Sequence, residues 1–287
     1  MQTIRTTQDL QHATAGARQA RKRLALVPTM GALHRGHLSL VRRAKEVADH
    51  VTVSIFVNPT QFGPAEDLDR YPRTFEADVE ALESVGGVDV VFAPTDQAMY
   101  PVEPRTWVEV DGFDQHLCGA GRPGHFRGVS TIVTKLFIAA TPDVAIFGLK
   151  DAQQFFLLKR MTLELGFPIE LIGAPIVRED DGLAFSSRNR YLSAAHRTQA
   201  VVLSQAVRTA GAMVEDGELR SEALVGAMLQ TLATAPDAEV EYAEVVDTAT
   251  LHPVARLLPD QEVLAAVAAR FGSTRLIDNC IVRVPAA

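Results

Sequence analysis

Residues 24–44, LALVPTMGALHRGHLSLVRRA, pass from a short apolar run to a helical pattern within a few positions. The run at 24–28 predicts a buried strand that ends at Pro28, and the amphipathic pattern that follows predicts a helix over 37–49. A strand that leads through a polar, glycine-bearing turn into a helix is the repeating unit of an α/β fold. This stretch therefore predicts the fold class of the first part of the chain.

The same alternation of apolar runs and amphipathic stretches continues to about residue 176. Further strands are expected at 51–57, 88–93, 106–110, 143–148 and 168–173, and further helices at 74–85, 128–140 and 151–165. Strands and helices in alternation predict a mostly parallel sheet with helices on both faces, joined by right-handed crossovers. Ligands of such sheets bind outside the carboxyl ends of the strands, where loops lead into helices.

The pattern changes after residue 176. Alanine-rich helices are expected at 194–215 and 221–233, and strands at 239–247, 262–271 and 274–282. This part reads as a smaller α+β domain, so the 287 residues divide into domains at 1–176 and 177–287. The polar segment REDDGLAFSSRNR, at 178–190, lies near the division, and we expect the active site to close by movement of one domain on the other.

Composition and charge exclude several classes of protein. A formal net charge of −7 and a pI near 5.6 argue against a protein that coats nucleic acid, which needs a surplus of Lys and Arg. Cys118 and Cys280 have no metal-ligand spacing and suggest no disulfide framework. The polar N-terminus and the lack of a long apolar run predict a cytoplasmic protein without a membrane span.

The turn PTMGALHRGH, at 28–37, has the features of a phosphate-binding site. Its glycines allow the close approach of a ligand, and the helix that follows is expected to offer unpaired N–H groups to an anion. His34 and His37 are three residues apart, so both can face one ligand and donate to its phosphate oxygens. A zinc site and an incidental structural role remain as alternatives, although HxxH lacks a third ligand and differs from HExxH. No P-loop motif is present, and no GxGxxG motif follows the first strand.

Three further polar segments are candidates for the site. In FGLKDAQQ, at 147–154, Lys150 suits a phosphate but could be a solvated surface lysine, and Asp151 could serve only as a helix N-cap. Gln61 and Gln154 suit a substrate with hydroxyl and carboxylate groups. LAFSSRNRYLS is either a mobile loop that closes on polyphosphate or a polar interdomain turn. GRPGHFRGV, at 121–129, either holds an anionic substrate or orders a loop through hydrogen bonds.

These segments together resemble the pantoate:beta-alanine ligase (pantothenate synthetase) family. PTMGALHRGHLSL, FVNPTQFGP with YPRT, RPGHFRGV, FGLKDAQQ and REDDGLAFSSRNRYLS occur in the family's order and spacing, over about residues 3–284. HRGH corresponds to the HIGH motif of the wider nucleotidyltransferase superfamily, and SSRN stands where its KMSKS-type loop belongs. HxGH alone is shared by several classes of enzyme, whereas the five segments together are highly specific.

The resemblance implies a Rossmann-like N-terminal domain, a smaller α+β C-terminal lid domain and a homodimer. The implied ligands are ATP, Mg²⁺ held mainly by ATP, pantoate and beta-alanine, with AMP and pyrophosphate as products. Carried over by position, the ATP site comprises Met30, Gly31, Ala32, Leu33, His34, Arg35, Gly36, His37, Gly148, Leu149, Lys150, Asp151, Val177, Phe185, Ser186, Ser187 and Arg188. The catalytic set is His37, His34, Lys150, Ser187 and Arg188, with His37 as the proton donor. The substrate set is Gln61 for pantoate and beta-alanine, Gln154 for pantoate, Asn58 and Met30. The family often has Glu where this chain has Cys118 and Leu149.

The expected reaction is a two-step ligation through a pantoyl adenylate, which needs no covalent enzyme intermediate. Positioning and charge stabilisation would supply the catalysis, and a closing lid would protect the adenylate from water. One alternative is a nucleotidyltransferase that adenylylates a small cofactor precursor without ligating an amine. A second is a non-enzymatic RNA-binding relative of the tRNA synthetases, against which the acidic composition argues.

Overall fold

The computed structural model of the protein describes residues 1–64 and 66–286. The chain forms two compact units. The N-terminal unit contains Met1–Val110, Arg122–Leu149 and Leu157–Pro175, and the C-terminal unit contains Asp111–Gly121, Lys150–Phe156 and Ile176–Ala287. Two segments that precede residue 176 therefore cluster with the C-terminal unit.

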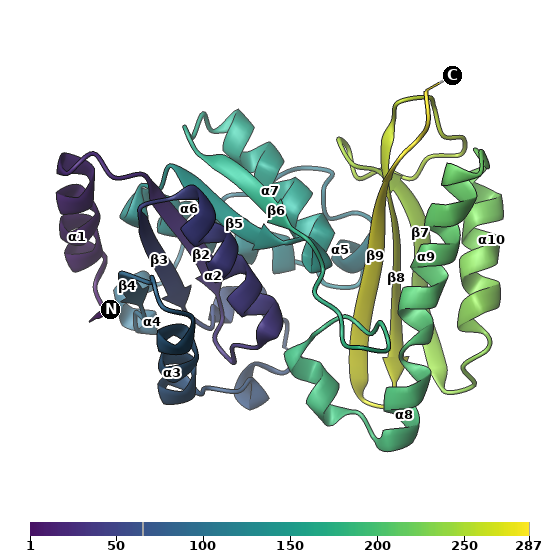
Figure 1. Ribbon diagram of the computed structural model, residues 1–287, viewed down its shortest axis with the longest axis horizontal. Coiled ribbons are helices and arrows are strands. Elements are labelled where there is room, and N and C mark those ends of the chain that lie inside the picture. The colour runs from purple at the N-terminus through teal and green to yellow at the C-terminus, as the bar shows by residue number, and fades with distance from the viewer. Residues whose placement is uncertain (65, 287) are drawn as a thin grey trace. The chain divides into compact units, whose positions relative to one another are not determined.

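The N-terminal unit is built on a six-stranded parallel sheet with the order β1-β4-β3-β2-β5-β6 (Figure 1). The strands are β1 (Gln2–Ile4), β2 (Leu24–Thr29), β3 (His50–Ile55), β4 (Val90–Phe92), β5 (Val144–Gly148) and β6 (Glu170–Ala174). From β2 the chain winds outward to β3 and β4, whereas β5 and β6 lie on the other side of β2. The strand order thus reverses between β2 and β5, which is the switch point where doubly wound sheets bind ligands.

Helices cover both faces of this sheet. The helices of the N-terminal unit are α1 (Thr7–Gln19), α2 (Arg35–Val47), α3 (Phe75–Val85), α4 (Asp96–Met99) and α6 (His125–Ala140), with α7 (Ala152–Glu164) continuing from the other unit. α2 packs beside α3, and α1 packs beside α6. Right-handed crossovers place these two pairs on opposite faces. The core on the α2 side is apolar and includes Val27, Leu40 and Ile146, each at most 7% exposed.

Two expectations for this unit need correction, and β1 and α1 were not expected. Residues 106–110 form no strand, because the amide of Val108 donates to Thr131 Oγ1 at 3.0 Å rather than to a neighbouring strand. Of the two unexpected elements, β1 is only three residues long and is defined by its pairing with β4. α6 begins at His125 rather than 128, directly after Gly124, whose φ of 79° suits a glycine.

The C-terminal unit is an antiparallel sheet of β7 (Ala238–Asp247), β8 (Glu262–Phe271) and β9 (Thr274–Arg283), covered on one face by helices (Figure 1). These are α9 (Val202–Glu215) and α10 (Ser221–Leu232), which pack on each other and on the strands. α5 (Leu117–Ala120) also belongs to this unit and contacts β8. The predicted helix 194–215 is divided into α8 (Ala194–Gln199) and α9, and no glycine or proline marks the interruption.

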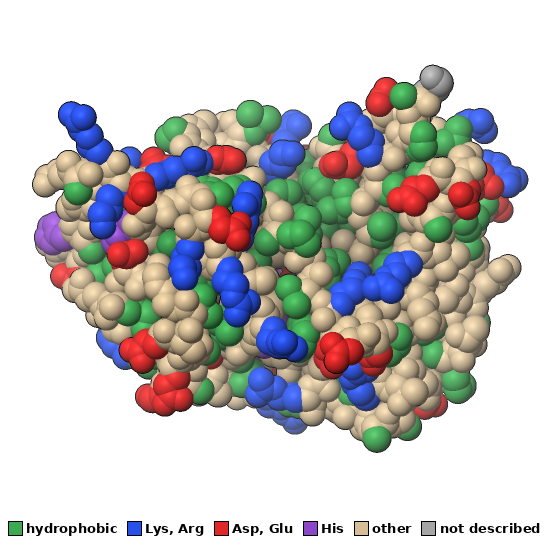
Figure 2. Space-filling view, viewed as in Figure 1, with side chains coloured by type: hydrophobic (Ala, Val, Ile, Leu, Met, Phe, Trp, Pro, Cys, Tyr) green, Lys and Arg blue, Asp and Glu red, His purple; other side chains and the backbone are tan. Residues whose placement is uncertain are grey.

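Acidic and basic side chains are both distributed over the face shown in Figure 2. Within the described residues, no helix combines the length and the apolar character needed to cross a membrane.

Candidate active site

The turn between β2 and α2 is held by hydrogen bonds of its own backbone amides. Thr29 Oγ1 donates to Ser54 O at 2.7 Å on β3 and accepts from the amide of Gly31 at 3.2 Å. Gly31 and Ala32 both have left-handed backbone, with φ of 81° and 50°. Two successive residues of this kind turn the chain sharply from the strand into the helix, and the alanine carries a steric cost that a glycine would not.

His34 and His37 cap the first turn of α2. The Nδ1 atom of His34 accepts from the amide of Gly36 at 3.1 Å, and the Nδ1 atom of His37 accepts from the amide of His34 at 3.4 Å. The two rings lie with their centroids 4.1 Å apart. A nitrogen that accepts an amide hydrogen carries none itself, so the neutral form of each ring has its hydrogen on Nε2.

This arrangement changes the predicted phosphate site. The amides of residues 31–34 and of Gly36 all donate within the protein, so these five are not among the unpaired amide groups that the sequence led us to expect. The two imidazole Nε2–H groups therefore become the better candidates for donors to an anion. Asp78, which the sequence did not identify, accepts the amides of Ala32 and Leu33.

The β5 end of the switch point lies beside α2. Gly148 ends β5, and a side chain at this position would meet Leu40 of α2 at 3.9 Å. Leu149 begins the 3₁₀ turn η3 (Leu149–Asp151) that leads into α7. In the N-terminal unit, the structure thus brings the helix that carries His37 next to Gly148.

Met30, Asn58 and Gln61 form a second cluster in the N-terminal unit. Gln61 ends the 3₁₀ turn η1 (Pro59–Gln61), and its Nε2 atom contacts Met30 Sδ at 3.1 Å. Asn58 is only 1% exposed, and its Nδ2 atom donates to Gln61 Oε1 at 3.1 Å and to Gly128 O at 3.2 Å. Its Oδ1 atom accepts from Tyr100 at 2.8 Å. Asn58 thus orients Gln61.

The segment RPGHFRGV surrounds the same turn. A Cβ atom on Gly128 would lie 2.5 Å from Thr60 O and 2.7 Å from Gln61 Cα, so only glycine allows α6 this close to η1. His125 Nδ1 lies 2.8 Å from Gln61 O, and Arg122 binds the Glu66 carboxylate through Nε at 2.8 Å. These contacts favour the loop-ordering interpretation of this segment over direct binding of an anion.

Tyr100 was also missed by sequence reasoning. Its hydroxyl lies 3.2 Å from Thr60 Oγ1 and donates to Asn58, and burial raises its pKa above the ordinary value. A tyrosine outside the five segments gives no sequence signal of such a contact.

In the C-terminal unit, adjacent residues of β9 hold two of the predicted segments. Asp278 forms a two-point ion pair with Arg178, at 2.6 and 2.9 Å. Asn279 Nδ2 donates to the carbonyl oxygen of Lys150 at 2.9 Å. The ammonium group of Lys150 lies 3.5 Å from Asp151 Oδ1. Gln154 is half-buried on α7, whereas its neighbour Gln153 is buried and donates to the carbonyl oxygens of residues 113 and 116.

The segment that carries Phe185–Arg188 folds back on itself. The amide of Phe185 donates to Val177 O at 3.0 Å, and Ser186 Oγ accepts from the amide of Arg188 at 3.2 Å. Ser186 thereby caps the 3₁₀ turn η4 (Ser187–Tyr191), so its hydroxyl has a structural role in addition to the predicted contact with ATP. The residues from 185 to 188 are all half-buried.

Two carboxylates of the same segment, Glu179 and Asp181, bind side chains that follow them in the chain. Asn189 Nδ2 donates to Glu179 Oε1 at 2.7 Å, and Arg197 pairs with Glu179 at 2.7 Å and Asp181 at 2.6 Å. The hydrogen bond from Arg197 lowers the pKa of Asp181, and the same bond raises the pKa of Arg197. Arg197 of α8 therefore ties the segment to that helix through two ion pairs.

Cys118, where the family often has Glu, makes its contacts within the C-terminal unit. Its sulfur lies 3.2 Å from the Tyr242 hydroxyl and 3.7 Å from a guanidinium nitrogen of Arg275, which also binds Glu241 at 2.6 Å. Burial is the main cause of a strongly raised pKa for Tyr242. Both cysteines of the chain are free thiols.

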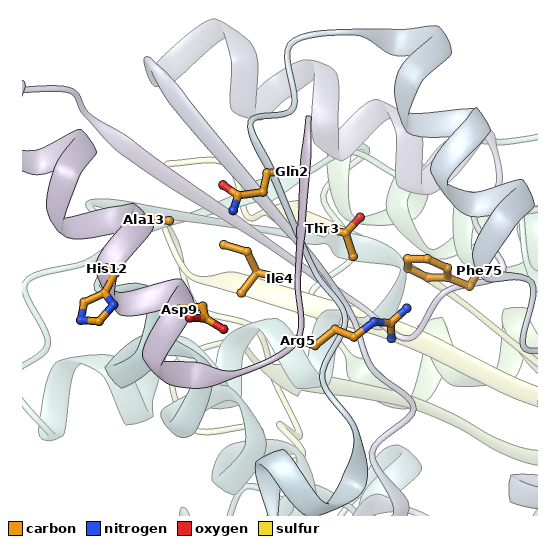
Figure 3. Close-up of a pocket in the computed structure, with 8 residues that line it drawn as sticks. All are labelled: Gln2, Thr3, Ile4, Arg5, Asp9, His12, Ala13 and Phe75. Carbon is orange, nitrogen blue, oxygen red and sulfur yellow. The ribbon is translucent and has the colours of Figure 1, made fainter.

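A separate pocket lies at the edge strand β1 (Figure 3). It is lined by Gln2, Thr3, Ile4, Arg5, Asp9, His12, Ala13 and Phe75, and it includes none of the predicted site residues. The guanidinium carbon of Arg5 lies 5.1 Å from the centre of the Phe75 ring.

Across residues 1–64 and 66–286, no group of three or more His, Cys, Asp or Glu side chains is arranged to hold a metal ion.

A doubly wound parallel sheet with paired imidazole donors at its switch point defines a class of α/β protein suited to phosphate-bearing ligands. The chain belongs to the pantoate-beta-alanine ligase family, whose model matches residues 2–281. It is 58% identical to the pantothenate synthetase of Salinibacter ruber, in an alignment that covers 100% of this chain and 99% of the relative.

Two solved structures extend this result to three dimensions. The pantothenate synthetase of Thermus thermophilus is 43% identical and has a TM-score of 0.90, covering 98% of this chain and 99% of that one. The pantoate-beta-alanine ligase of Francisella tularensis, in complex with beta-gamma ATP and beta-alanine, is 31% identical with a TM-score of 0.79. That alignment covers 98% of this chain and 97% of the Francisella chain. The expected fold, with a parallel α/β sheet and a smaller C-terminal α+β part, is confirmed.

Proposed function

We propose that this protein ligates pantoate to beta-alanine at the expense of ATP, forming pantothenate with release of AMP and pyrophosphate. The observation that carries this proposal is the family match over residues 2–281, which spans both units of the structure. The Francisella relative, which is similar along nearly its whole length, has been crystallised with beta-gamma ATP and beta-alanine. Ligation accounts for both of these ligands, whereas nucleotidyl transfer without an amine accounts only for ATP.

The chemistry proceeds in two balanced steps. A carboxylate oxygen of pantoate attacks the α-phosphorus of ATP, and the bond to the bridging oxygen breaks so that pyrophosphate leaves. The amine of beta-alanine then attacks the acyl carbon, AMP leaves, and the amine nitrogen loses a proton. Positioning and stabilisation of the charge on the phosphates would supply most of the rate enhancement.

The residue roles belong to this proposal. His34 and His37 would donate from Nε2 to the phosphates, supported by the amide contacts that occupy both Nδ1 atoms. The turn at 30–37, Gly148–Asp151, Val177 and Phe185–Arg188 would line the ATP site, and Lys150, Ser187 and Arg188 would add polar contacts to the phosphates. Gln61 would bind pantoate and beta-alanine, next to Met30 and Asn58, and Gln154 would bind pantoate.

Magnesium would reach this site bound to the phosphates of ATP. Asp78, whose carboxylate contacts the histidine-bearing turn, already accepts two amide hydrogens, at 3.0 and 2.7 Å. The donor set of the turn, which is amides and imidazoles, suits phosphate oxygens better than a hard cation. When bound, the ion would neutralise phosphate charge.

Three further parts of the proposal concern the whole protein. The C-terminal part, which we take as 177–287, would act as a lid that protects the adenylate from water. The protein would form a homodimer, as the family resemblance implies. It would act in the cytoplasm, whose reducing conditions keep thiols such as its two free cysteines reduced.

The test is an assay of AMP release with ATP alone, with pantoate, and with pantoate and beta-alanine. Rapid AMP release is expected only with all three substrates, and positional isotope exchange within ATP is expected with pantoate alone. Nucleotide turnover that is indifferent to beta-alanine would favour nucleotidyl transfer. Salt-sensitive RNA binding without any turnover would favour the RNA-binding alternative.

A further inference from the structure

Asp78 is a buried carboxylate on α3 that contacts the backbone of another loop. Its side chain is among those most removed from water, at 2% exposed. Oδ2 accepts from the amide of Ala32 at 3.0 Å, and Oδ1 accepts from the amide of Leu33 at 2.7 Å and from the hydroxyl of Thr74 at 3.2 Å. A buried charge is costly unless it is hydrogen-bonded, and here the turn between β2 and α2 supplies two of the three donors.

The turn needs this partner because its backbone is strained. Ala32 has a φ of 50°, a left-handed conformation that an L-residue with a Cβ atom adopts at a steric cost. The amides of Ala32 and Leu33 point toward one carboxylate only while the backbone keeps this conformation. Gly31 is packed against the same group, since a Cβ atom there would lie 2.9 Å from Asp78 Oδ2.

The conformation of Leu33 determines where α2 begins. Leu33 directly precedes His34, whose ring caps the helix by accepting the amide of Gly36 at 3.1 Å. The amide of His34 in turn donates to His37 Nδ1 at 3.4 Å. A turn released from Asp78 would change the direction of the His34 amide, and both ring contacts depend on the position of His34.

We propose that Asp78 is a positioning residue, which fixes the turn so that the rings of His34 and His37 keep their hydrogens on Nε2 and present them as donors. Asp78 does not touch substrate in this scheme. It acts through the backbone of residues 32–34. The kinetic consequence rests on the proposed ligation, whereas the tautomers of the two rings do not depend on it.

The competing explanation is that Asp78 only stabilises the fold. The chain offers a control in Asp143, whose Oδ2 atom accepts from the amide of Leu24 at 2.8 Å and whose side chain, 39% exposed, also lies 3.7 Å from Arg18. Leu24 is the first residue of β2, so this contact lies at the opposite end of the strand from the histidine-bearing turn. Asp143→Ala therefore removes a carboxylate–amide contact that lies away from the histidine-bearing turn.

The first readout is nitrogen NMR of the protein with isotope-labelled histidine, without ligands. The chain has eight histidines, and His34→Gln and His37→Gln identify the two signals of interest. In the wild type and in Asp143→Ala, both rings should show the neutral form with hydrogen on Nε2. In Asp78→Ala the two signals should broaden or shift toward a mixture of tautomers, while those of the other histidines remain unchanged.

The second readout is the rate of adenylate formation with ATP and pantoate. We expect Asp78→Ala to lower this rate by about 10²-fold, the scale of a small misplacement of catalytic groups, with the larger effect on kcat than on KM. Asp78→Asn should be less impaired, because its amide oxygen can still accept one of the two amides. Asp143→Ala should remain close to the wild type.

The outcomes separate this inference from the proposed function. Unchanged His34 and His37 tautomers in a folded Asp78→Asn or Asp78→Ala protein would overturn the positioning role, whether or not the enzyme is active. Equal losses of rate in Asp78→Ala and Asp143→Ala would also overturn it. If Asp78→Ala fails to fold, Asp78→Asn carries the test. A wild type that makes no pantothenate would instead contradict the proposed function.

Discussion

The ion pair between Arg178 and Asp278 allows a quantitative test of how the segment that carries Ser186–Arg188 is held. The Asp278 side chain is 1% exposed and that of Arg178 is 19% exposed, and Arg178 also donates to Gly182 O at 3.0 Å. Replacing Asp278 with Leu leaves the guanidinium largely buried without its partner, which typically costs about 3–5 kcal/mol. We therefore expect Asp278→Leu to lower the free energy of unfolding by about that amount.

Urea unfolding followed by circular dichroism measures this loss, and hydrogen exchange in 178–191 shows whether it is local. As a control, Glu164→Gln breaks the contact with Arg160, in which both side chains are about half exposed, at 47% and 52%. That change should cost at most about 0.5 kcal/mol. The double variant Arg178→Met with Asp278→Leu should be less destabilised than the sum of the single variants, because it removes both charges together. Additive losses, or a loss below about 1 kcal/mol for Asp278→Leu, would refute the reasoning.

Three other changes test separate parts of the structure. Gly128→Ala should destabilise the protein by about 1–3 kcal/mol in urea unfolding and raise the KM for pantoate, because its Cβ atom would lie 2.5 Å from backbone atoms. Its control is Gly226→Ala in α10, where a Cβ atom would have nothing within 4 Å, and this change should be neutral or stabilising in the same titration. His37→Ala should slow adenylate formation by about 10²–10³-fold, measured as pyrophosphate release, and a near-normal rate would remove its catalytic role. Burial lowers the pKa of His50, so the unfolded state binds a proton more readily and the free energy of unfolding should fall as pH decreases below 6.5. Urea unfolding above and below that pH should show a smaller pH dependence in His50→Gln.

The parallel sheet was predictable because its strands are buried on both faces. Runs such as 24–28 and 143–148 are almost wholly apolar and stand between amphipathic stretches, and the structure has strands at both places. The run at 106–110, TWVEV, is rich in residues that favour strands, yet the amide of Val108 is satisfied by a side chain of α6. The local pattern of apolar and polar residues does not determine which group a backbone amide hydrogen-bonds to.

The place of the histidine-bearing turn in the fold was predictable from the sequence, whereas the contacts of its side chains were not. HRGH was expected after the carboxyl end of a parallel strand, and the structure has it there, between β2 and α2; that β2 lies at the switch point is known only from the strand order of the structure. The capping role of the histidine rings requires knowledge of ring orientation, and the contact of Asp78 joins residues far apart in the chain. One signal was available for Asp78, since Phe75, Asp78 and Leu82 fall on one face of the helix, and a carboxylate on a buried face needs a partner.

The anchoring of the turn by Asp78 also bears on the order in which the protein folds. The two contacts connect residues separated by 46 and 45 positions, and β3 and most of the following crossover lie between them. During synthesis the turn therefore has no anchor until α3 has emerged and docked on the sheet. Because contacts between distant residues form late, secondary structure should return before nucleotide affinity when the denatured protein is refolded.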